Sequence, residues 1–423
     1  MSATEKLTSG LGDEPATAPS EASAPAGVVR PGAADAGVLR LGHQLREVGR
    51  TLDARFLDKA EAIRLLLVTL LAGEHMLLVG PPGTAKSALV RSLARLVDAR
   101  YFEYLLTRFS EPNELFGPVD IKAFREGIFV RRVEAMLPDA EIVFLDEIFK
   151  SNSAILNALL SILNERRFFT GSRTMKVPLC SLFGATNEVP NDEALGAIFD
   201  RFLVRTMSEN LDSFHFHGLV ARGIRGEIAE LTGAADTVTP LVSLVDIRKA
   251  QARLGEFLSF PEEWMARYKG FVFQIRAEGI SLSDRRLVKL LKLFASSAIL
   301  DGRPNVDDGD FFILKHVWNS PEQIPILDDI IGPALERHHR DHPDARRAGV
   351  SATDLDGILA ELQVIRRILL GGEALSDVQL FSQLRNLQDL RAALQLLGTE
   401  TARAVSAEVD KLLEGVFESS KWA

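Results

Sequence analysis

The sequence predicts an α/β fold, in which a parallel sheet lies between helices, followed by a region built of helices alone. Three short apolar runs, at residues 75–79, 142–145 and 179–185, predict buried strands. Runs of this length with turn residues behind them are typical of parallel strands covered on both faces. Helical patterns such as residues 154–163 separate the runs, and this alternation indicates a parallel sheet.

The composition is that of an ordinary globular protein. Of the 423 residues, 46% are hydrophobic and 25% are charged, which excludes a largely disordered or fibrous chain. At roughly 100–200 residues per domain, this length predicts more than one domain. The 49 Lys and Arg against 58 Asp and Glu give a net charge of −9. No overall positive field therefore attracts nucleic acid, and we do not expect a nucleic-acid partner.

Cellular location is suggested by what the sequence lacks. The longest apolar run, residues 65–72, is far shorter than the ~20 residues that span a bilayer, so we expect no membrane span. The single cysteine, Cys180, excludes a disulfide framework and fits a reducing compartment. The N-terminus has no basic start or apolar core of a secretory signal. We therefore expect a cytoplasmic protein.

The first elements follow an N-terminal tail. Residues 1–38 are rich in Ala, Pro and Gly and have almost no large apolar side chains, which predicts disorder. From residue 39 the pattern becomes an amphipathic helix, and residues 61–71 continue it at helical spacing. We expect the α/β region to cover residues 39–206.

A phosphate-binding loop follows the first predicted strand. The segment reads Gly80-Pro81-Pro82-Gly83-Thr84-Ala85-Lys86-Ser87 and leads into a helical run that starts at Ala88. In such a loop, backbone N–H groups and the N-terminus of the next helix face the phosphates of a nucleotide. We expect nucleotide contacts from Pro82, Gly83, Thr84, Ala85, Lys86, Ser87 and Ala88.

Two side chains of this loop are expected to contact the nucleotide and its metal ion, and one residue differs from the usual sequence pattern of phosphate-binding loops. Lys86 is expected to contact the β- and γ-phosphates, and the Ser87 hydroxyl to ligate Mg²⁺. Ala85 stands where the pattern has its second glycine, a residue that tolerates positive φ. Alanine there either adopts an ordinary conformation or is mildly strained.

The other two predicted strands end in polar residues. Residues 142–145 lead into Asp146 and Glu147, and the third strand is followed by Asn187. Open α/β sheets bind ligands at this edge. Asp146 suits a Mg²⁺ contact, Glu147 suits a base that polarises the attacking water, and Asn187 could hold that water or a phosphate oxygen. The alternatives are a solvated acidic turn and a turn-forming asparagine.

Arg201 lies in the segment Asp200-Arg201-Phe202, which closes the α/β region. Its guanidinium could neutralise charge on the γ-phosphate across a subunit boundary. A structural salt bridge is an equally good interpretation.

Beyond residue 206 the patterns are helical. They cover residues 227–231, 241–257, 262–276 and 286–300. Three further amphipathic patterns between residues 355 and 416 predict a small C-terminal bundle.

Taken together, these residues resemble the MoxR group of AAA+ ATPases, most of all its RavA branch. The resemblance covers about residues 40–320. Besides the phosphate-binding loop and Leu145-Asp146-Glu147, it rests on Thr107-Arg108-Phe109-Ser110, Glu114-Leu115-Phe116-Gly117-Pro118, Ala154-Ile155-Leu156-Asn157, Asn164-Glu165-Arg166 and Ser283-Asp284-Arg285-Arg286. In the RavA branch, too, alanine precedes the lysine of the loop.

The resemblance implies a P-loop AAA+ core (residues 39–206) and an all-α lid (207–320), and it stops near residue 320. The helical patterns beyond that point predict a C-terminal helical extension (321–423), which we expect to bind a partner or to stabilise an oligomer. The resemblance implies ATP and Mg²⁺, with the nucleotide bound between core and lid. Asn187 matches the sensor-1 position and Arg201 the arginine finger. Arg285 matches the sensor-2 arginine, with Arg286 as the alternative. Phe56 and Leu57 match adenine-contacting positions, although helix packing explains them equally well.

The resemblance also implies partners. The family forms hexameric rings, and it often works with proteins that carry a von Willebrand factor A domain. Two inserted hairpins are expected at residues 120–137 and 166–176. Phe168-Phe169 and Arg131-Arg132 on these hairpins could contact a substrate, and packing between subunits is an equal alternative.

The function that follows is an ATP-hydrolysing, ring-forming remodeller of chaperone type, which changes the conformation of a protein partner. One alternative is a nucleic-acid translocase, which stimulation of hydrolysis by DNA would favour. Another is a nucleotide-dependent scaffold with little turnover, which replacement of Glu147 by glutamine would test.

Overall fold

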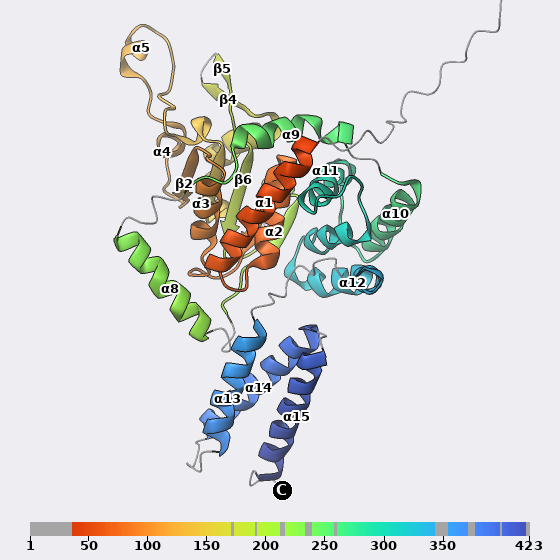
Figure 1. Ribbon diagram of the computed structural model, residues 1–423. Coiled ribbons are helices and arrows are strands. Elements are labelled where there is room, and N and C mark those ends of the chain that lie inside the picture. Colours follow the sequence, from red (N-terminus) through yellow and green to blue (C-terminus); the bar gives the residue numbers. More distant parts are fainter. Residues whose placement is uncertain are drawn as a thin grey trace, which may run out of the picture.

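The computed structural model describes residues 36–170, 173–190, 193–211, 216–232, 239–257, 260–342, 354–370, 377–397 and 400–419. Most of the predicted disordered tail, residues 1–38, lies outside the described residues, and its last three residues begin helix α1 (Ala36–Arg55). Figure 1 shows a sheet flanked by helices, with further helices beside it and three helices below.

The central sheet is parallel throughout and confirms the predicted fold class. It consists of β1 (Met76–Val79), β2 (Tyr101–Leu105), β3 (Ile142–Asp146), β6 (Ser181–Thr186) and β7 (Val204–Met207), in the order β2-β3-β6-β1-β7. The three predicted strands are β1, β3 and β6, with ends shifted by one or two residues. Nearly all of their side chains are buried.

Two strands escape the apolar-run criterion because each carries a charged residue at its centre. In β2, Glu103 accepts hydrogen bonds at 2.9 and 2.8 Å from Arg91 and at 2.9 Å from the hydroxyl of Tyr101. In β7, Arg205 is completely buried. Because partners on other elements satisfy these charges, the strands form without apolar sequences.

Helices cover both faces of the sheet (Figure 1). They are α2 (Ala60–Ala72), α3 (Lys86–Leu96), α4 (Pro112–Phe116), α6 (Ser153–Glu165) and α7 (Glu193–Phe199), with 3₁₀ turns η1 (Leu137–Asp139) and η2 (Ile148–Lys150). Helix α2 ends at Gly73, whose positive φ of 66° lets its N–H bond back to the last turn. This turn leads directly into β1.

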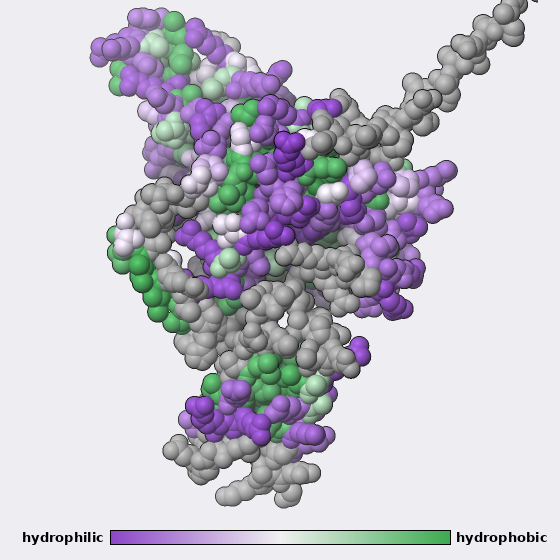
Figure 2. Space-filling model, in the orientation of Figure 1, coloured by the Kyte–Doolittle hydropathy of each residue, from purple (hydrophilic) through white to green (hydrophobic). Residues whose placement is uncertain are grey.

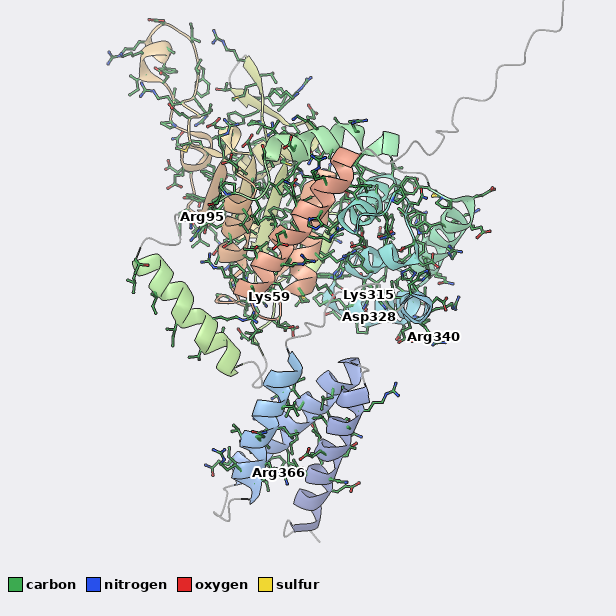
Figure 3. The ribbon with its side chains drawn as sticks, in the orientation of Figure 1. Lys59, Arg95, Lys315, Asp328, Arg340 and Arg366 are labelled. Carbon is green, nitrogen blue, oxygen red and sulfur yellow. The ribbon has the colours of Figure 1, made fainter. Side chains whose placement is uncertain are left out.

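The helical region that follows shares one apolar core with the sheet. It comprises α8 (Phe216–Leu231), α9 (Leu244–Phe257), α10 (Glu262–Ala277), α11 (Asp284–Leu300), η5 (Asp308–His316), η6 (Pro321–Gln323) and α12 (Ile324–Asp341). Its centre is Trp264, which stacks on Phe311 with ring centroids 4.8 Å apart and meets Phe294 edge-on. An ion pair of 2.7 Å between Lys315 and Asp328 joins η5 to α12 (Figure 3).

Helix α12 corrects one expected boundary. Leu327, Ile331 and Leu335 of this helix belong to the same apolar cluster as the sheet and α11. We therefore place the proposed start of the C-terminal extension after residue 341 instead of at residue 321.

The three predicted C-terminal helices are α13 (Asp354–Leu370), α14 (Asp377–Leu397) and α15 (Glu400–Ser419). They bury an apolar cluster of their own, which includes Ile365, Leu387 and Val409. Figure 2 shows hydrophobic (green) surface over this part of the molecule. An ion pair of 2.8 Å joins Arg366 on α13 to Glu408 on α15.

Two hairpins project from the same side of the core (Figure 1). The first carries the short helix α5 (Ile121–Arg125) and is closed by pairing of Val119 with Arg131. The second pairs β4 (Arg167–Thr170) with β5 (Arg173–Lys176). Among the described residues, no helix is long and apolar enough to cross a membrane.

Candidate nucleotide site

The loop after β1 is fixed between its two neighbouring strands. The N–H of Gly80 donates to the Thr186 carbonyl at 3.0 Å, and the Ser208 N–H donates to the Val79 carbonyl at 2.7 Å. A side chain at Gly80 would start only 2.2 Å from the Ser208 carbonyl oxygen, so glycine is required there. Gly83 has a φ of +84° in open space, which favours glycine for conformational reasons.

The sequence left open whether Ala85 has an ordinary or a mildly strained backbone conformation, and the structure shows the strained one. Ala85 precedes α3 with φ 62° and ψ 21°, in the left-handed region. An alanine pays a steric cost there that a glycine does not. The conformation turns the chain so that α3 begins directly behind the loop.

Lys86 lies along the loop with its ammonium group bound to backbone. Its Nζ donates to the carbonyls of Gly80 at 2.8 Å and Pro81 at 2.7 Å, and the side chain is buried. Burial lowers the pKa of Lys86, and the carboxylates of Asp146 and Glu147 act in the opposite direction. The cation therefore lies between the loop and the acidic end of β3.

Glu147 is held by donors from two elements. Its N–H donates to Asp146 Oδ1 at 2.9 Å. Its Oε1 accepts a hydrogen bond of 2.5 Å from Asn187 Nδ2 and lies 3.0 Å from Lys150 Nζ. Asn187 reaches Glu147 because β6 and β3 are neighbours in the sheet. The sequence indicated Glu147 and Asn187 but not Lys150, whose signal is only its position three residues after Glu147.

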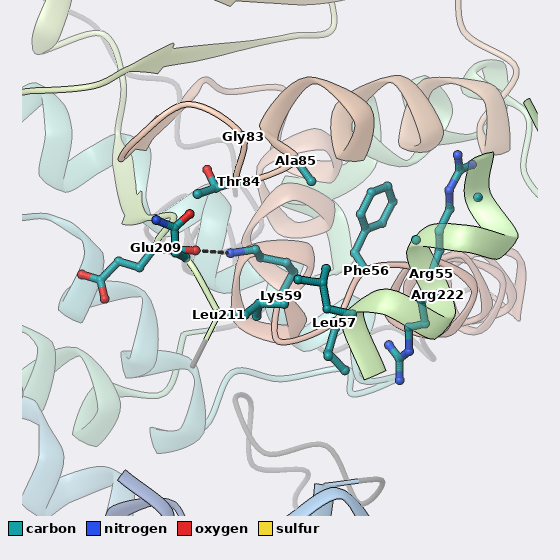
Figure 4. A pocket seen from close by; sticks show the side chains of 14 residues that line it. Arg55, Phe56, Leu57, Lys59, Gly83, Thr84, Ala85, Glu209, Leu211 and Arg222 are labelled. Carbon is teal, nitrogen blue, oxygen red and sulfur yellow. Dashed lines mark hydrogen bonds between the residues drawn. The ribbon is translucent and has the colours of Figure 1, made fainter. Parts of the chain in front are cut away.

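A pocket beside the loop is formed by the α1–α2 connection, residues 209–211 and α8 (Figure 4). Phe56 and Leu57 line it, together with Gly83, Thr84 and Ala85. The structure thus places the two predicted adenine-contacting positions next to the loop.

The sequence did not indicate the three cationic residues that line this pocket, Arg55, Lys59 and Arg222. Lys59 Nζ donates to the Glu209 carbonyl at 3.0 Å (Figure 4), and Arg222 on α8 donates to the Asp53 carbonyl at 2.9 Å. Burial lowers the pKa of Lys59, whereas Asp58 and Glu209 raise it. Lys59 and Arg222 thus bind backbone oxygens, and neither belongs to a recognisable motif.

The donor set beside the loop fits a magnesium ion bound together with phosphates. The available oxygen donors are the Ser87 hydroxyl at the start of α3 and the Asp146 carboxylate at the end of β3. Within the described part of the chain, no group of three or more His, Cys, Asp or Glu side chains could hold a metal ion by itself. Mg²⁺ usually takes only one or two protein ligands and completes its shell with water and phosphate oxygens.

The predicted arginines lie at the other edge of the sheet. The Leu203 N–H donates to the carbonyl of His75, which precedes β1, so Arg201 lies where the strands begin. The phosphate-binding loop lies where β1 ends. The four residues of β1 separate the two edges by about 13 Å. Arg201 lies still farther from the loop, because it precedes the first residue of β7.

Arg201 and Arg285 are close together at that edge. Arg201 lies 3.4 Å from Asp200 Oδ2, and its pKa is lowered by burial and by the charge of Arg285. Arg285 is exposed and donates to Asn164 Oδ1 at 2.7 Å. Arg286, in contrast, is buried and donates to the carbonyls of Leu203 and Val317. Arg285 is therefore the better sensor-2 candidate of the two.

The pocket lies between the core and the beginning of the region expected to form the lid, because residues 209–211 and α8 line it together with the loop. Of the helical region, only α8 supplies residues that line the pocket, and α9 to α12 supply none of them. Arg285, at the start of α11, lies with Arg201 and not with Lys86.

Comparisons with known families match the two regions separately. The MoxR domain of the MoxR-vWA-beta-propeller ternary systems matches residues 43–245, and an AAA lid domain matches residues 268–331.

Individual proteins of known sequence are also similar to this chain. The uncharacterized protein MJ0812 of Methanocaldococcus jannaschii is 38% identical over 345 residues, which are 78% of this chain and 84% of that protein. MJ0079 from the same organism is 39% identical over 68% of this chain and 74% of its own length. Chaperone MoxR1 of Mycobacterium tuberculosis is 29% identical over 43% of this chain and 48% of its own.

A solved structure supports the fold. The crystal structure of an ATPase candidate from Cytophaga hutchinsonii superposes with a TM-score of 0.56 at 20% identity. The superposition covers 71% of this chain and 96% of that one.

Proposed function

Since the chain belongs to the MoxR-type AAA+ ATPases, we propose that it hydrolyses ATP at the loop of residues 82–88. Lys86 exchanges its backbone carbonyl partners for phosphate oxygens, and the N–H groups at the start of α3 face the same phosphates. Ser87 and Asp146 hold Mg²⁺, which when bound offsets charge on the phosphate oxygens. Phe56 and Leu57 contact the base.

Glu147 orients and polarises the attacking water. Its carboxylate oxygen Oε1 already lies on the amide of Asn187, so a water bound to the carboxylate lies between β3 and β6. Asn187 thereby fixes the carboxylate and contacts the γ-phosphate side of the site. Release of the Lys150 contact frees Oε1 for the water.

The main support for this proposal is the position of Arg201 and Arg285, which lie at the edge of the sheet opposite to the phosphate-binding loop. A subunit cannot bring these arginines to its own nucleotide, but it can present them to the nucleotide of a neighbour. Arg201 lies next to the like charge of Arg285, with Asp200 as the acidic residue beside it, and a γ-phosphate would supply further negative charge to the pair. We therefore propose a ring, with six subunits as the family resemblance implies.

The test is ATP hydrolysis and mass by light scattering for the wild type, Lys86→Ala and Arg201→Ala. We expect hydrolysis to rise with assembly, to disappear in both variants, and to return partly when the two are mixed, because a mixed interface can combine an intact loop with an intact arginine. Full hydrolysis by Arg201→Ala, or turnover by a strict monomer, contradicts the proposal.

The work of the ring is proposed to be chaperone-like remodelling of a protein partner. Support comes from the relative named chaperone MoxR1 and from the family description, which pairs the MoxR domain with vWA proteins. A vWA-domain protein is thus the proposed partner. The closer likeness to the RavA branch, and the cytoplasmic location, stay predictions.

The two projecting hairpins are the proposed contact with that partner. Phe124 at the tip of the first hairpin is 60% exposed, and Phe169 on the second is 54% exposed. Phe168 is not available, because it is buried against Phe116 with ring centroids 5.0 Å apart. Arg131 is also engaged, since it donates to Asn113 and to the Gly117 carbonyl.

A further inference from the structure

Two buried arginines lie directly behind the proposed trans-acting pair. Arg205 of β7 has no exposed surface, and Arg286 of α11 is 2% exposed. Arg205 follows Arg201 by four residues, and Arg286 adjoins Arg285. Burial lowers the pKa of Arg286 to about 10, and burial together with the charge of Arg286 lowers the pKa of Arg205 well below its usual range, while the charge of Asp200 acts in the opposite direction on both.

Neutral oxygen atoms, and no carboxylate, accept the hydrogen bonds of these two guanidinium groups. Arg205 donates to the carbonyls of Phe199, Val317 and Trp318. Arg286 donates to the carbonyls of Leu203 at 3.3 Å and Val317 at 2.9 Å. The charge of Asp200 favours both guanidinium groups, but their hydrogen bonds go to neutral oxygens, and burial of two like charges side by side is costly. Stability alone therefore does not explain the pair.

Asn319 connects the two groups. Its Oδ1 accepts hydrogen bonds from Arg205 at 3.2 Å and from Arg286 at 3.0 Å. Its Nδ2 donates to the Ser281 carbonyl at 2.9 Å, and its backbone N–H donates to Gln323 Oε1 at 2.7 Å. One residue therefore joins the strand that follows Arg201, the turn that precedes Arg285, and the segment that enters α12, through its side-chain amide and its backbone N–H.

We propose that Asn319, Arg205 and Arg286 are positioning residues that hold Arg201 and Arg285 as one unit against the ATP of the neighbouring subunit. The inference rests on the proposed shared site. Arg201 and Arg285 repel each other, and the charge of Asp200 partly offsets this at Arg201. A rigid connection behind them keeps both guanidinium groups at the separation that a γ-phosphate requires, so that little is lost in ordering them at each turnover.

Asn319→Ala removes the shared acceptor and leaves Arg201 and Arg285 in place. We expect kcat to fall about tenfold through misplacement of the pair, with KM for ATP changed less than about twofold because the loop is untouched. Asn319→Asp, whose carboxylate still accepts from both arginines, should keep most of the wild-type kcat. Asn305→Ala, at an exposed position on the same region, is the matched control and should behave as wild type.

Complementation separates positioning from a purely structural role. Asn319→Ala mixed with Lys86→Ala should regain activity, because about a quarter of randomly formed interfaces combine an intact loop with an intact arginine pair. Asn319→Ala mixed with Arg201→Ala should regain none, because both variants are defective on the same side. Asn319→Ser, whose hydroxyl lies one bond closer to the backbone and so does not reach both guanidinium groups, should give the same pattern if the alanine variant does not fold.

The outcomes distinguish this inference from the proposed function. If Arg201→Ala hydrolyses ATP at the wild-type rate, the shared site itself is wrong. If Arg201→Ala is inactive but Asn319→Ala keeps its kcat, or loses activity that Lys86→Ala does not restore, only the positioning role is wrong.

Discussion

At the scale of single residues, the site depends on side chains whose partners come from neighbouring strands. Glu147 alone is an acidic residue after a strand, and its position becomes informative through the 2.5 Å contact with Asn187. Lys86, in contrast, is bound to the carbonyls of its own loop. Each of these contacts joins residues of one edge of the sheet.

Glu147→Gln tests the proposed base. Glutamine keeps the size of the side chain but removes the charge that polarises water, so we expect hydrolysis to fall by at least about 100-fold. Binding of ATP, measured by fluorescence of a labelled analogue, should be retained because Lys86 and the loop are unchanged. Asp308→Asn, a remote carboxylate on η5, is the control, and equal losses in both variants would contradict the assignment.

Ala85→Gly tests the strain in the loop. Because Ala85 has a φ of 62°, glycine should relieve a steric cost and raise the free energy of unfolding by up to about 1 kcal/mol. Ala88→Gly, in the ordinary first turn of α3, should instead lower it by about 1 kcal/mol. Urea unfolding of both variants measures the difference, and destabilisation of equal size in both would refute the left-handed conformation.

At the scale of elements, strand β4 of the second hairpin shows how neighbouring side chains, which point to opposite faces of a strand, can serve packing on one face and partner contact on the other. Phe168 faces inward and stacks on Phe116 of α4, whereas Phe169 faces outward. The inward residue fixes the hairpin on the core, which leaves its neighbour free for a partner. The sequence placed both phenylalanines on the hairpin and could not separate them, because α4 is far away in the chain.

Phe168→Ala and Phe169→Ala form a matched pair for this division. Loss of the buried ring should lower the free energy of unfolding by about 3–5 kcal/mol, and loss of the exposed ring should change it by less than about 0.5 kcal/mol. Urea unfolding measures both. Similar losses in the two variants would show that the register of β4 is different.

At the scale of the whole molecule, the described residues bury two separate apolar clusters. The larger joins the sheet to the helices up to α12, and the smaller lies within α13 to α15. Since no apolar residue belongs to both, the two parts should unfold as distinct cooperative units.

Calorimetry with two core substitutions tests this independence. Leu387→Ala in the small cluster and Leu290→Ala in the large one both remove a fully buried side chain, at a cost of about 2–5 kcal/mol. We expect each substitution to lower the midpoint temperature of one thermal transition and to leave that of the other unchanged. A single transition that both variants lower would show one cooperative unit.

The sequence by itself determined the parts of this protein that are local. The three strands β1, β3 and β6, the loop of residues 80–87 and most of the long helices could be predicted because apolar periodicity and turn chemistry act over short stretches of chain. The same local patterns indicated Lys86, Glu147 and Asn187 as candidates.

Only the tertiary structure decided which of these residues meet. It formed β2 and β7 in spite of their central charges, because Arg91 and the carbonyls of residues 317 and 318 supply partners from elsewhere. In the folded chain, Arg285 also lies away from the loop of its own subunit. Its neighbour Arg286 is connected to Arg205 of β7 through Asn319, which accepts a hydrogen bond from each. Contacts of this kind depend on the packing of distant segments, and no pattern within one segment records them.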